Sequence, residues 1–260
     1  MRALLAALLA TLLAVSGAGA QGAPPDEVIG YSQGSQPLII RHLGSGQTRV
    51  LILGGQHGGP ERNTVELVEG LYDYFSTNPE QIPPGVELDV LPVANPDGLA
   101  DGSRQFLSGV DPNRNWGGPD WRSDAYDSNG RFRVGLGGLE PFSEQETRAL
   151  ADWVLRAHPA LVVNYHSAGS FMFGGRDGLA GDISSAYADA SGYYWPQPGS
   201  GTSPLPYRAS GSMNVWLRET GIPGILVELS TPNTPEISRN LAGLKAALAV
   251  LAAAASQPAS

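Results

Sequence analysis

The sequence predicts an α/β fold in which a mixed, mostly parallel twisted sheet carries helices on both faces. Short apolar runs of strand length alternate with longer segments whose apolar residues recur at helical spacing. The 34 glycines and 21 prolines are spread along the chain, as expected for turns between such elements. The 260 residues, 42% of them hydrophobic, are enough to build one sizeable core. Together these features favour layered α/β architecture over disorder.

The first half of the chain gives clear element boundaries. Residues 50–53 form an apolar run that ends in two glycines, which predicts a buried strand. Apolar residues at helical spacing predict a helix over 63–75, with Asn63 or Thr64 as its cap. Residues 86–93 predict a second strand. These segments read as one strand–helix–strand unit.

A glycine-rich stretch then runs from about 97 to 141 and opens with a predicted turn at 95–98. Ser143 with Glu146 three residues later has the pattern of a capping box, which predicts a helix to about 157. The remaining expected elements are a strand at 161–165, a helix at 210–220, a strand at 225–229 and a packing helix at about 238–255.

Three residues with chemical potential stand at or just beyond predicted strand ends. These are His57, His166 and Glu228. In open α/β sheets ligands bind outside the carboxyl ends of the strands, so this placement favours one shared site.

Charge and cysteine content exclude several classes of protein. The formal net charge is −9 and charged residues make up 16%, so the chain lacks the basic footprint that nucleic acid or an anionic membrane requires. The absence of cysteine excludes disulfides, thiol catalysis, thiolate ligands and a lipid-anchored N-terminal cysteine. Any histidine chemistry must come from His42, His57, His158 and His166.

The N-terminus predicts a signal peptide at 1–20. Arg2 gives a positive start, an Ala/Leu run follows, and small residues at 17–20 form a cleavage site. The apolar run is too short to remain as a membrane span, so we expect a secreted or periplasmic protein that is not a lipoprotein. The expected organisation is a signal peptide at 1–20, a short segment at 21–28, one folded domain at 29–255 and a tail at 256–260.

Two histidines and one carboxylate suit a catalytic zinc ion, which takes three protein ligands and leaves a fourth position open. His57 and Glu61 lie four residues apart in a glycine-rich loop that could turn both side chains toward one point. His166 would come from a distant strand end. Each pattern taken alone is weak, because a histidine near a tight turn is more often structural.

The segment 109–116, Gly-Val-Asp-Pro-Asn-Arg-Asn-Trp, resembles a signature of the zinc metallocarboxypeptidases. Further pieces follow in that family's order, namely HGGPE at 57–61, NPDG at 95–98, NYHS at 164–167, YRASG at 207–211 and VEL at 227–229. The resemblance covers roughly residues 30–240 and implies a carboxypeptidase A-like fold. Within the family it implies a secreted bacterial member that is similar to the murein peptide amidases.

By this resemblance His57, Glu61 and His166 hold one zinc ion and Glu228 is the base that takes a proton from the attacking water. The usual family spacing is H-x-x-E, whereas three residues separate His57 from Glu61 here. Arg104 takes the place of the arginine that stabilises the oxyanion.

The substrate-binding residues also follow from the resemblance. Asn113 and Arg114 match the clamp for a free C-terminal carboxylate, and Tyr207 matches the mobile tyrosine that covers it. Counting seven positions from Tyr207 places Asn214 in the side-chain pocket, although the register could slip to Met213. Asn214 is neither acidic nor apolar, so the preferred side chain stays open.

The expected activity is hydrolysis of the C-terminal peptide bond by a monomer, with a peptide bearing a free C-terminus as substrate. A second enzymatic reading is a cell-wall amidase that cuts γ-D-glutamyl-diaminopimelate bonds of muropeptides. A small-molecule deacylase with the same metal site is a third. A non-catalytic peptide-binding pseudoenzyme is the alternative from another class, favoured by the unusual spacing and opposed by the presence of Glu228.

Overall fold

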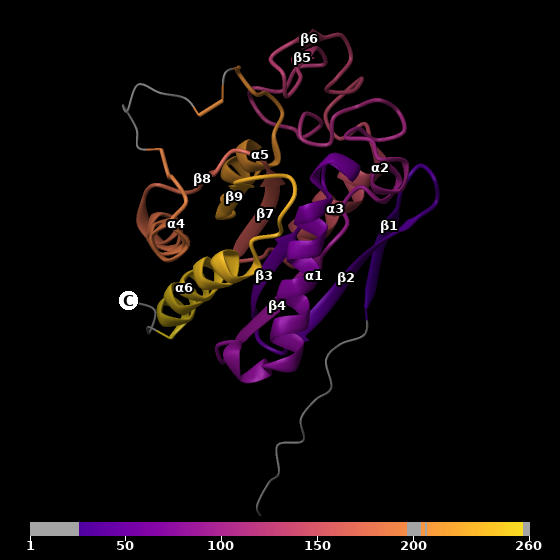
Figure 1. The fold of residues 1–260 in the computed structure, drawn as a ribbon. Helices are drawn as coiled ribbons and strands as arrows, with labels where there is room; N and C mark the ends of the chain where they lie inside the picture. Colours follow the sequence, from indigo (N-terminus) through magenta and orange to yellow (C-terminus); the bar gives the residue numbers. More distant parts are fainter. Residues whose placement is uncertain (1–25, 197–203, 206, 257–260) are drawn as a thin grey trace, which may run out of the picture.

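The computed structural model describes residues 26–196, 204–205 and 207–256, so the predicted signal peptide at 1–20 and the last tail residues lie outside it. Within the described part, a seven-stranded sheet has the order β1-β2-β4-β3-β7-β9-β8 (Figure 1). Its four central strands are parallel: β4 (Val86–Leu91), β3 (Thr48–Leu53), β7 (Leu161–Ser167) and β9 (Gly224–Leu229). The other strands pair antiparallel: β1 (Glu27–Tyr31) and β8 (Phe171–Phe173) at the two edges, and β2 (Pro37–Gly44) between β1 and β4. The predicted mixed sheet is therefore confirmed.

Helices cover both faces of this sheet because successive side chains of a strand point to opposite faces. Val50 and Ile52 of β3 belong to the core on one face, which is completed by α1 (Arg62–Thr77), α4 (Gly178–Ser191) and α6 (Ile237–Ala255). Leu51 and Leu53 belong to the core on the other face, under α3 (Gln145–Ala157) and α5 (Met213–Thr220). Strand β3 is thus apolar on both sides, as the sequence predicts for a buried parallel strand.

The glycine-rich stretch lies at one end of the sheet, beyond the carboxyl ends of the central strands (Figure 1). It contains α2 (Pro96–Asp101) and a small hairpin of β5 (Ala125–Tyr126) and β6 (Phe132–Arg133). The predicted turn at 95–98 is in fact the start of α2, because the Asn95 side chain accepts a hydrogen bond from the Gly98 amide at 2.9 Å and caps a short helix.

The predicted caps of the two long helices are wrong. Glu61 caps α1, while Thr64 donates to the Glu61 carbonyl and Asn63 donates to the Thr231 carbonyl. Thr64 also accepts from the Gly55 amide, so both side chains have partners outside the helix instead of capping it. The capping box does not form before α3 either, where Ser143 donates to the Glu144 carboxylate and Glu146 accepts from the Gln33 amide.

Several elements had no clear sequence signal. The antiparallel strands β1, β2 and β8 and helix α4 were not predicted, and neither was the 3₁₀ helix η2 (Pro79–Gln81). Helix α4 is rich in glycine, alanine and serine, so its apolar periodicity is weak. Edge strands are exposed on one side and show the buried pattern only in part.

Helix α6 is the only helix in the described part of the chain that is long and apolar enough to cross a membrane by length and composition. Its Leu244 and Leu248 side chains are fully buried in the core that it shares with Tyr187 of α4. At Gly243, a Cβ atom would lie 2.8 Å from the Tyr187 ring, so glycine permits this close packing. In this fold α6 therefore acts as a packing helix.

A polar cluster links β2 and β4 near the edge of the sheet. Nδ1 of His42 lies 2.7 Å from Oδ1 of Asp89, and Arg49 donates to the same carboxylate at 2.6 and 2.9 Å. The hydrogen bond to Asp89, against a smaller opposing effect of burial, raises the pKa of His42 above its ordinary value. Because Arg49 is also paired to Asp89, the cluster is a network in which basic side chains are paired with an acidic one.

We predict that His42→Gln destabilises the protein more at pH 6 than at pH 9. The folded-state pKa of His42 is raised, so its stabilising contribution is present below the unfolded-state pKa and is lost as pH rises through the folded-state value. Urea unfolding of both proteins at the two pH values measures this. A difference in unfolding free energy that is the same at both values would contradict the linkage.

Candidate metal-dependent active site

The carboxyl ends of three adjacent parallel strands bring the predicted site residues together. Strands β3, β7 and β9 are neighbours in the sheet, and His166 of β7 pairs in register with Glu228 of β9. His57 follows β3 after a short loop. Parallel strands end at the same edge, so residues more than 100 positions apart in sequence meet at one point.

The loop after β3 explains how Glu61 joins His57 despite the longer spacing. Gly58 has φ of 49°, and a Cβ at this position would lie 2.4 Å from the Ser103 carbonyl oxygen. Glycine is therefore required for both its conformation and its close approach. The 3₁₀ turn η1 (Gly59–Glu61), with proline inside its first turn, then brings the Glu61 side chain back beneath His57. The longer loop is accommodated as one extra tight turn.

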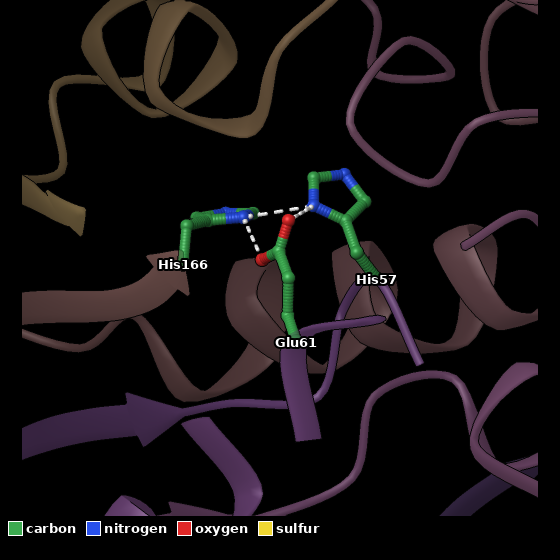
Figure 2. Close-up of side chains that lie close together, drawn as sticks. All are labelled: His57, Glu61 and His166. Atoms are coloured by element: carbon green, nitrogen blue, oxygen red, sulfur yellow. Dashed lines mark hydrogen bonds and ion pairs between the residues drawn. The ribbon is translucent and has the colours of Figure 1, made fainter. Parts of the chain in front are cut away.

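His57, Glu61 and His166 converge on one point (Figure 2). Nδ1 of His57 lies 2.8 Å from Oε1 of Glu61, and Nδ1 of His166 lies 3.1 Å from Oε2 of the same carboxylate. The two Nδ1 atoms are themselves 3.1 Å apart. All three side chains are at most 3% exposed, so the atoms meet in a site shielded from water.

These three residues fit a zinc ion. Zinc bound to nitrogen and oxygen at about 2.0–2.1 Å in a tetrahedron has ligand atoms roughly 3.3 Å apart, close to the separations seen here. Within the described part of the chain, Nε2 of His166 is buried without a hydrogen-bond partner. Two neutral imidazoles and a carboxylate are also the donor set expected of a catalytic site with an open position.

Asp111 and Arg104 complete a buried charge network around the cluster. Oδ1 of Asp111 lies 3.2 Å and Nη2 of Arg104 lies 2.9 Å from Nε2 of His57, so this nitrogen donates to Asp111 when protonated and accepts from Arg104 when not. Arg104 donates to Asp111 at 3.0 Å and to Glu61 at 2.7 Å. Burial favours the neutral acid, but Arg104 and His57 outweigh it and hold the pKa of Asp111 well below its usual range.

The carboxylate of Glu61 is kept ionised in the same way. Burial opposes its charge, but the adjacent His57 and His166 rings lower its pKa well below the ordinary value. For Arg104, burial opposes the charged form and Asp111 and Glu61 outweigh this effect, so its pKa is raised. Glu61 is therefore held as a carboxylate, the form in which it can bind a metal.

Glu228 lies beside this network, and within the described residues it forms no ion pair. Burial raises the pKa of Glu228 to about 7, while His166 lowers it and Glu61 raises it. A cation at the neighbouring cluster would lower this value. A carboxylate next to a metal site with its pKa near neutrality is suited to exchange protons with a substrate or water.

Asn113 and Arg114 lie close to this cluster and are held by main-chain atoms. The Asn113 carbonyl oxygen Oδ1 accepts from the Met213 amide at 2.9 Å, which leaves Nδ2 for a ligand. Arg114 donates through Nε to the Tyr126 carbonyl and through Nη1 to the Asn113 carbonyl. Its guanidinium carbon lies 5.6 Å from the centre of the Tyr207 ring. A cation, an amide and a phenol thus share one side of the site.

A cavity of about 780 Å³ connects these groups. Its lining includes seven of the nine residues predicted from the sequence: His57, Arg104, Asn113, Arg114, Tyr207, Asn214 and Glu228. Glu61 and His166 are not part of the lining but lie directly behind His57. The structure therefore brings all nine predicted residues into one region.

Some residues that lie at the candidate site had no role predicted from the sequence. Asp111 was inside the quoted 109–116 segment, so its position in that motif was the available signal. Arg176 and Arg218 line the cavity, but no motif marked them, and Arg208, which also lines it, lies in the quoted YRASG segment at 207–211 without a role of its own. Arg176 follows the unpredicted strand β8, and only the tertiary fold brings it near the site.

A buried site for one divalent cation, with a separate proton acceptor beside it, defines a metal-dependent hydrolase. Residues 27–237 match the family model described as zinc carboxypeptidase. The chain therefore belongs to the zinc carboxypeptidase family, a zinc-dependent family, and the resemblance found in the sequence is confirmed.

Individual relatives add detail. Murein peptide amidase A of Escherichia coli K12 is 35% identical over 123 residues, which are 45% of this chain and 48% of that protein. The match thus spans about half the length of this curated relative. The crystal structure of murein-tripeptide amidase from Escherichia coli O157 has a TM-score of 0.63 at 25% identity and covers 91% of this chain and 94% of its own.

More distant structures show the same fold. Bovine thrombin-activatable fibrinolysis inhibitor, in complex with tick carboxypeptidase inhibitor, has a TM-score of 0.67 at 19% identity, with 90% of each chain covered. Carboxypeptidase A of Helicoverpa armigera has a TM-score of 0.65 at 19% identity and covers 90% of this chain and 70% of its own. The predicted carboxypeptidase-like fold class is confirmed by these neighbours.

We predict that Asp111→Asn weakens zinc binding by about 10- to 100-fold, as is usual when the partner of a metal-bound histidine is lost. The amide cannot supply the negative charge that His57 and Arg104 face. Titration of the purified protein with zinc against a competing chelator measures this. Asp124→Asn, at an exposed position of the same glycine-rich stretch, is the control. Equal zinc affinity for Asp111→Asn and wild type would contradict the prediction.

Proposed function

We propose that this protein is a zinc-dependent peptidase that hydrolyses the amide bond preceding a C-terminal residue with a free carboxylate. One observation carries the proposal. A single cavity is lined at once by His57 of the candidate zinc site, by Glu228, and by the Asn113–Arg114 pair that can bind a carboxylate. Hydrolytic groups and a carboxylate clamp in one space are what an exopeptidase requires.

Zinc held by His57, Glu61 and His166 would supply a Lewis acid and lower the pKa of a bound water. The chain's own groups do the rest. Glu228 accepts a proton from the attacking water and returns it to the amine that leaves, so that one water and one amide give a carboxylate and an amine. The isolation of Glu228 from any bonded cation keeps it basic enough for this exchange.

Arg104 supports the developing negative charge on the former carbonyl oxygen. Its guanidinium is fixed by Asp111 and Glu61 and lines the cavity beside His57. A preorganised cation of this kind lowers the barrier because it needs no reorganisation when the charge forms.

Arg114 and Asn113 bind the C-terminal carboxylate of the substrate. The guanidinium offers parallel N–H groups that suit a carboxylate, and the amide Nδ2 adds another donor. Tyr207 lies against Arg114 and would cover the bound end of the peptide. These assignments make the free carboxylate the recognition element of the substrate.

A second candidate is amidase action on cell-wall peptides, which would cut the bond between γ-D-glutamate and diaminopimelate. The matched segment of murein peptide amidase A favours it, as does the full-length similarity to the solved murein-tripeptide amidase. The same groups would act in both cases, because a muropeptide also ends in a free carboxylate. A panel of muropeptides and blocked dipeptides separates the two.

We predict that Glu228→Gln lowers kcat/KM by about 10²–10⁴-fold, the usual contribution of a general base, while zinc content stays at the wild-type level. The amide keeps the shape of the side chain but cannot take a proton. Steady-state kinetics on an N-acylated dipeptide, together with metal analysis of the same sample, measures both quantities.

The matched control is Glu66→Gln, an exposed position on α1 that should retain full turnover. Full activity of Glu228→Gln would refute the proposed base. A wild-type protein that binds zinc but hydrolyses no peptide in a broad panel would instead support a binding module.

We also predict that Arg114→Gln lowers kcat/KM on peptides with a free C-terminus by roughly 10- to 100-fold, equivalent to about 1.5–3 kcal/mol for a hydrogen bond to a charged group. Peptides with an amidated C-terminus should be poor substrates for the wild-type protein, and Arg114→Gln should lower their kcat/KM little further. Arg122→Gln, exposed in the same stretch, is the control. Equal losses on free and amidated peptides would contradict a carboxylate clamp.

A further inference from the structure

The cavity has a charge opposite to that of the whole protein. The chain contains 16 lysines and arginines against 25 aspartates and glutamates. Among the described residues, five arginines line the cavity and only two acidic residues do, Asp177 and Glu228. A concave site with such a local excess of positive charge concentrates anionic ligands. The arginines are Arg104, Arg114, Arg176, Arg208 and Arg218.

Two of these arginines already have a place in the proposed function. Arg104 is neutralised by the buried carboxylates of Asp111 and Glu61. Arg114 is assigned to the C-terminal carboxylate of the substrate. The positive charge that remains unexplained lies on Arg176, Arg208 and Arg218.

Arg176 and Arg218 are held in place without a strong acidic partner in the described part of the chain. The Arg176 guanidinium lies 4.5 Å from the centre of the Trp195 ring and donates to the Pro196 carbonyl, so its charge is retained. Arg218 pairs with its neighbour Glu219 at 3.4 Å, but these side chains are 70% and 47% exposed. An ion pair this exposed is weak and leaves Arg218 available to a ligand.

Both arginines lie toward the end of the cavity away from Glu228. Strand β9 runs back from Glu228 to Gly224 over about 13 Å, at roughly 3.3 Å per residue. Antiparallel β8 sets Phe173 opposite Leu226, two residues back from Glu228, and Arg176, three residues further along the chain, lines the cavity together with Gly224. The loop 221–223 lines this same end.

Helix α5 brings Arg218 to this end as well. Asn214 lies beside Gly224, with its Oδ1 only 3.6 Å from where a Cβ on that glycine would be. Arg218 follows four residues later, one turn on along the same helix face. Within the described residues, Oδ1 of Asn214 is buried without a hydrogen-bond partner, so the wall between the clamp and the arginines is polar.

We propose that Arg176 and Arg218 form a second carboxylate subsite, so that the preferred substrate ends in a dicarboxylic residue with an acidic group on a long side chain. The inference rests on the proposed function and specifies its substrate class. The α-carboxylate binds Arg114, the side chain extends past Asn214, and its carboxylate meets the two arginines. Diaminopimelate and glutamate both belong to this class, and the longer side chain of diaminopimelate extends further toward the two arginines.

The test compares zinc-loaded protein on N-acylated dipeptides that end in glutamate, glutamine, 2-aminoadipate or diaminopimelate. Glutamate and glutamine have the same shape and differ in the side-chain charge. The expected result is a kcat/KM at least tenfold higher for glutamate than for glutamine, and higher still for the longer acids. This ratio should fall as salt is raised, because the subsite is partly exposed.

Substitutions identify the residues responsible. Arg176→Gln and Arg218→Gln should each reduce the glutamate-to-glutamine ratio by about threefold to tenfold, whereas Arg176→Lys, which keeps the charge, should reduce it less. Arg156→Gln, on the exposed face of α3 and outside the cavity lining, is the matched control and should leave the ratio unchanged. Thermal unfolding of each variant verifies that the fold is intact.

A binding measurement separates failure of this inference from failure of the proposed function. Calorimetry should show N-acetylglutamate binding more tightly than N-acetylglutamine, with the difference lost in Arg176→Gln. If peptides are cleaved with no preference for acidic ends, the subsite is wrong and the peptidase stands. If no peptide is cleaved but the difference in binding is found, the subsite stands and the peptidase fails. Equal binding of the two ligands overturns the subsite in either case.

Discussion

The site depends on the compensation of buried charge around His57. Glu61 and Asp111 are carboxylates withdrawn from water on two sides of this ring, and neither would remain ionised without a partner. Arg104 bridges them and keeps both in the charged state. Because the two carboxylates and Arg104 stabilise one another's charges, the ligand set is preorganised. The free-energy cost of bringing these charges together is met on folding, before any cation binds.

The parallel sheet makes this arrangement possible. Its central strands are buried on both faces by two separate cores, so the strand ends are rigid supports for His166 and Glu228. The loops that follow are free to vary, and the HGGPE turn shows how one additional residue is absorbed by a 3₁₀ turn next to a glycine in the left-handed region. The geometry of the ligands is preserved although their spacing in sequence is not.

The excess charge of the residues that line the cavity is opposite in sign to the net charge of the whole protein. The protein as a whole is acidic, which disfavours polyanionic partners at a distance, while the cavity collects arginines. The family shared by peptidases and murein amidases needs one carboxylate clamp. In this chain Arg176 and Arg218 line the same cavity, and the proposed subsite links the two functional candidates through a common preference for acidic ends.

The sequence by itself predicted the central strands, most of the main helices and the three residues that converge as a candidate metal site. Runs such as 50–53 and 161–165 are apolar on both faces, and this local pattern suffices to locate strand ends and the residues that follow them. The motif around Asn113 and Arg114 supplied the clamp by resemblance. The helix caps could not be obtained this way, because Thr64, Asn63 and Glu146 have side-chain partners elsewhere in the fold that compete with the local cap.

The tertiary structure alone decided which distant side chains meet. That Glu61 reaches His57 depends on a turn conformation next to Ser103, and the contacts of Asp111 and Arg104 depend on how the glycine-rich stretch folds over the sheet edge. Arg176, which follows an unpredicted edge strand, and Arg218, on the predicted helix at 210–220, line one cavity only in the folded chain. Sequence patterns report local burial, whereas such contacts are set by long-range packing, and for that reason only the folded chain reveals them.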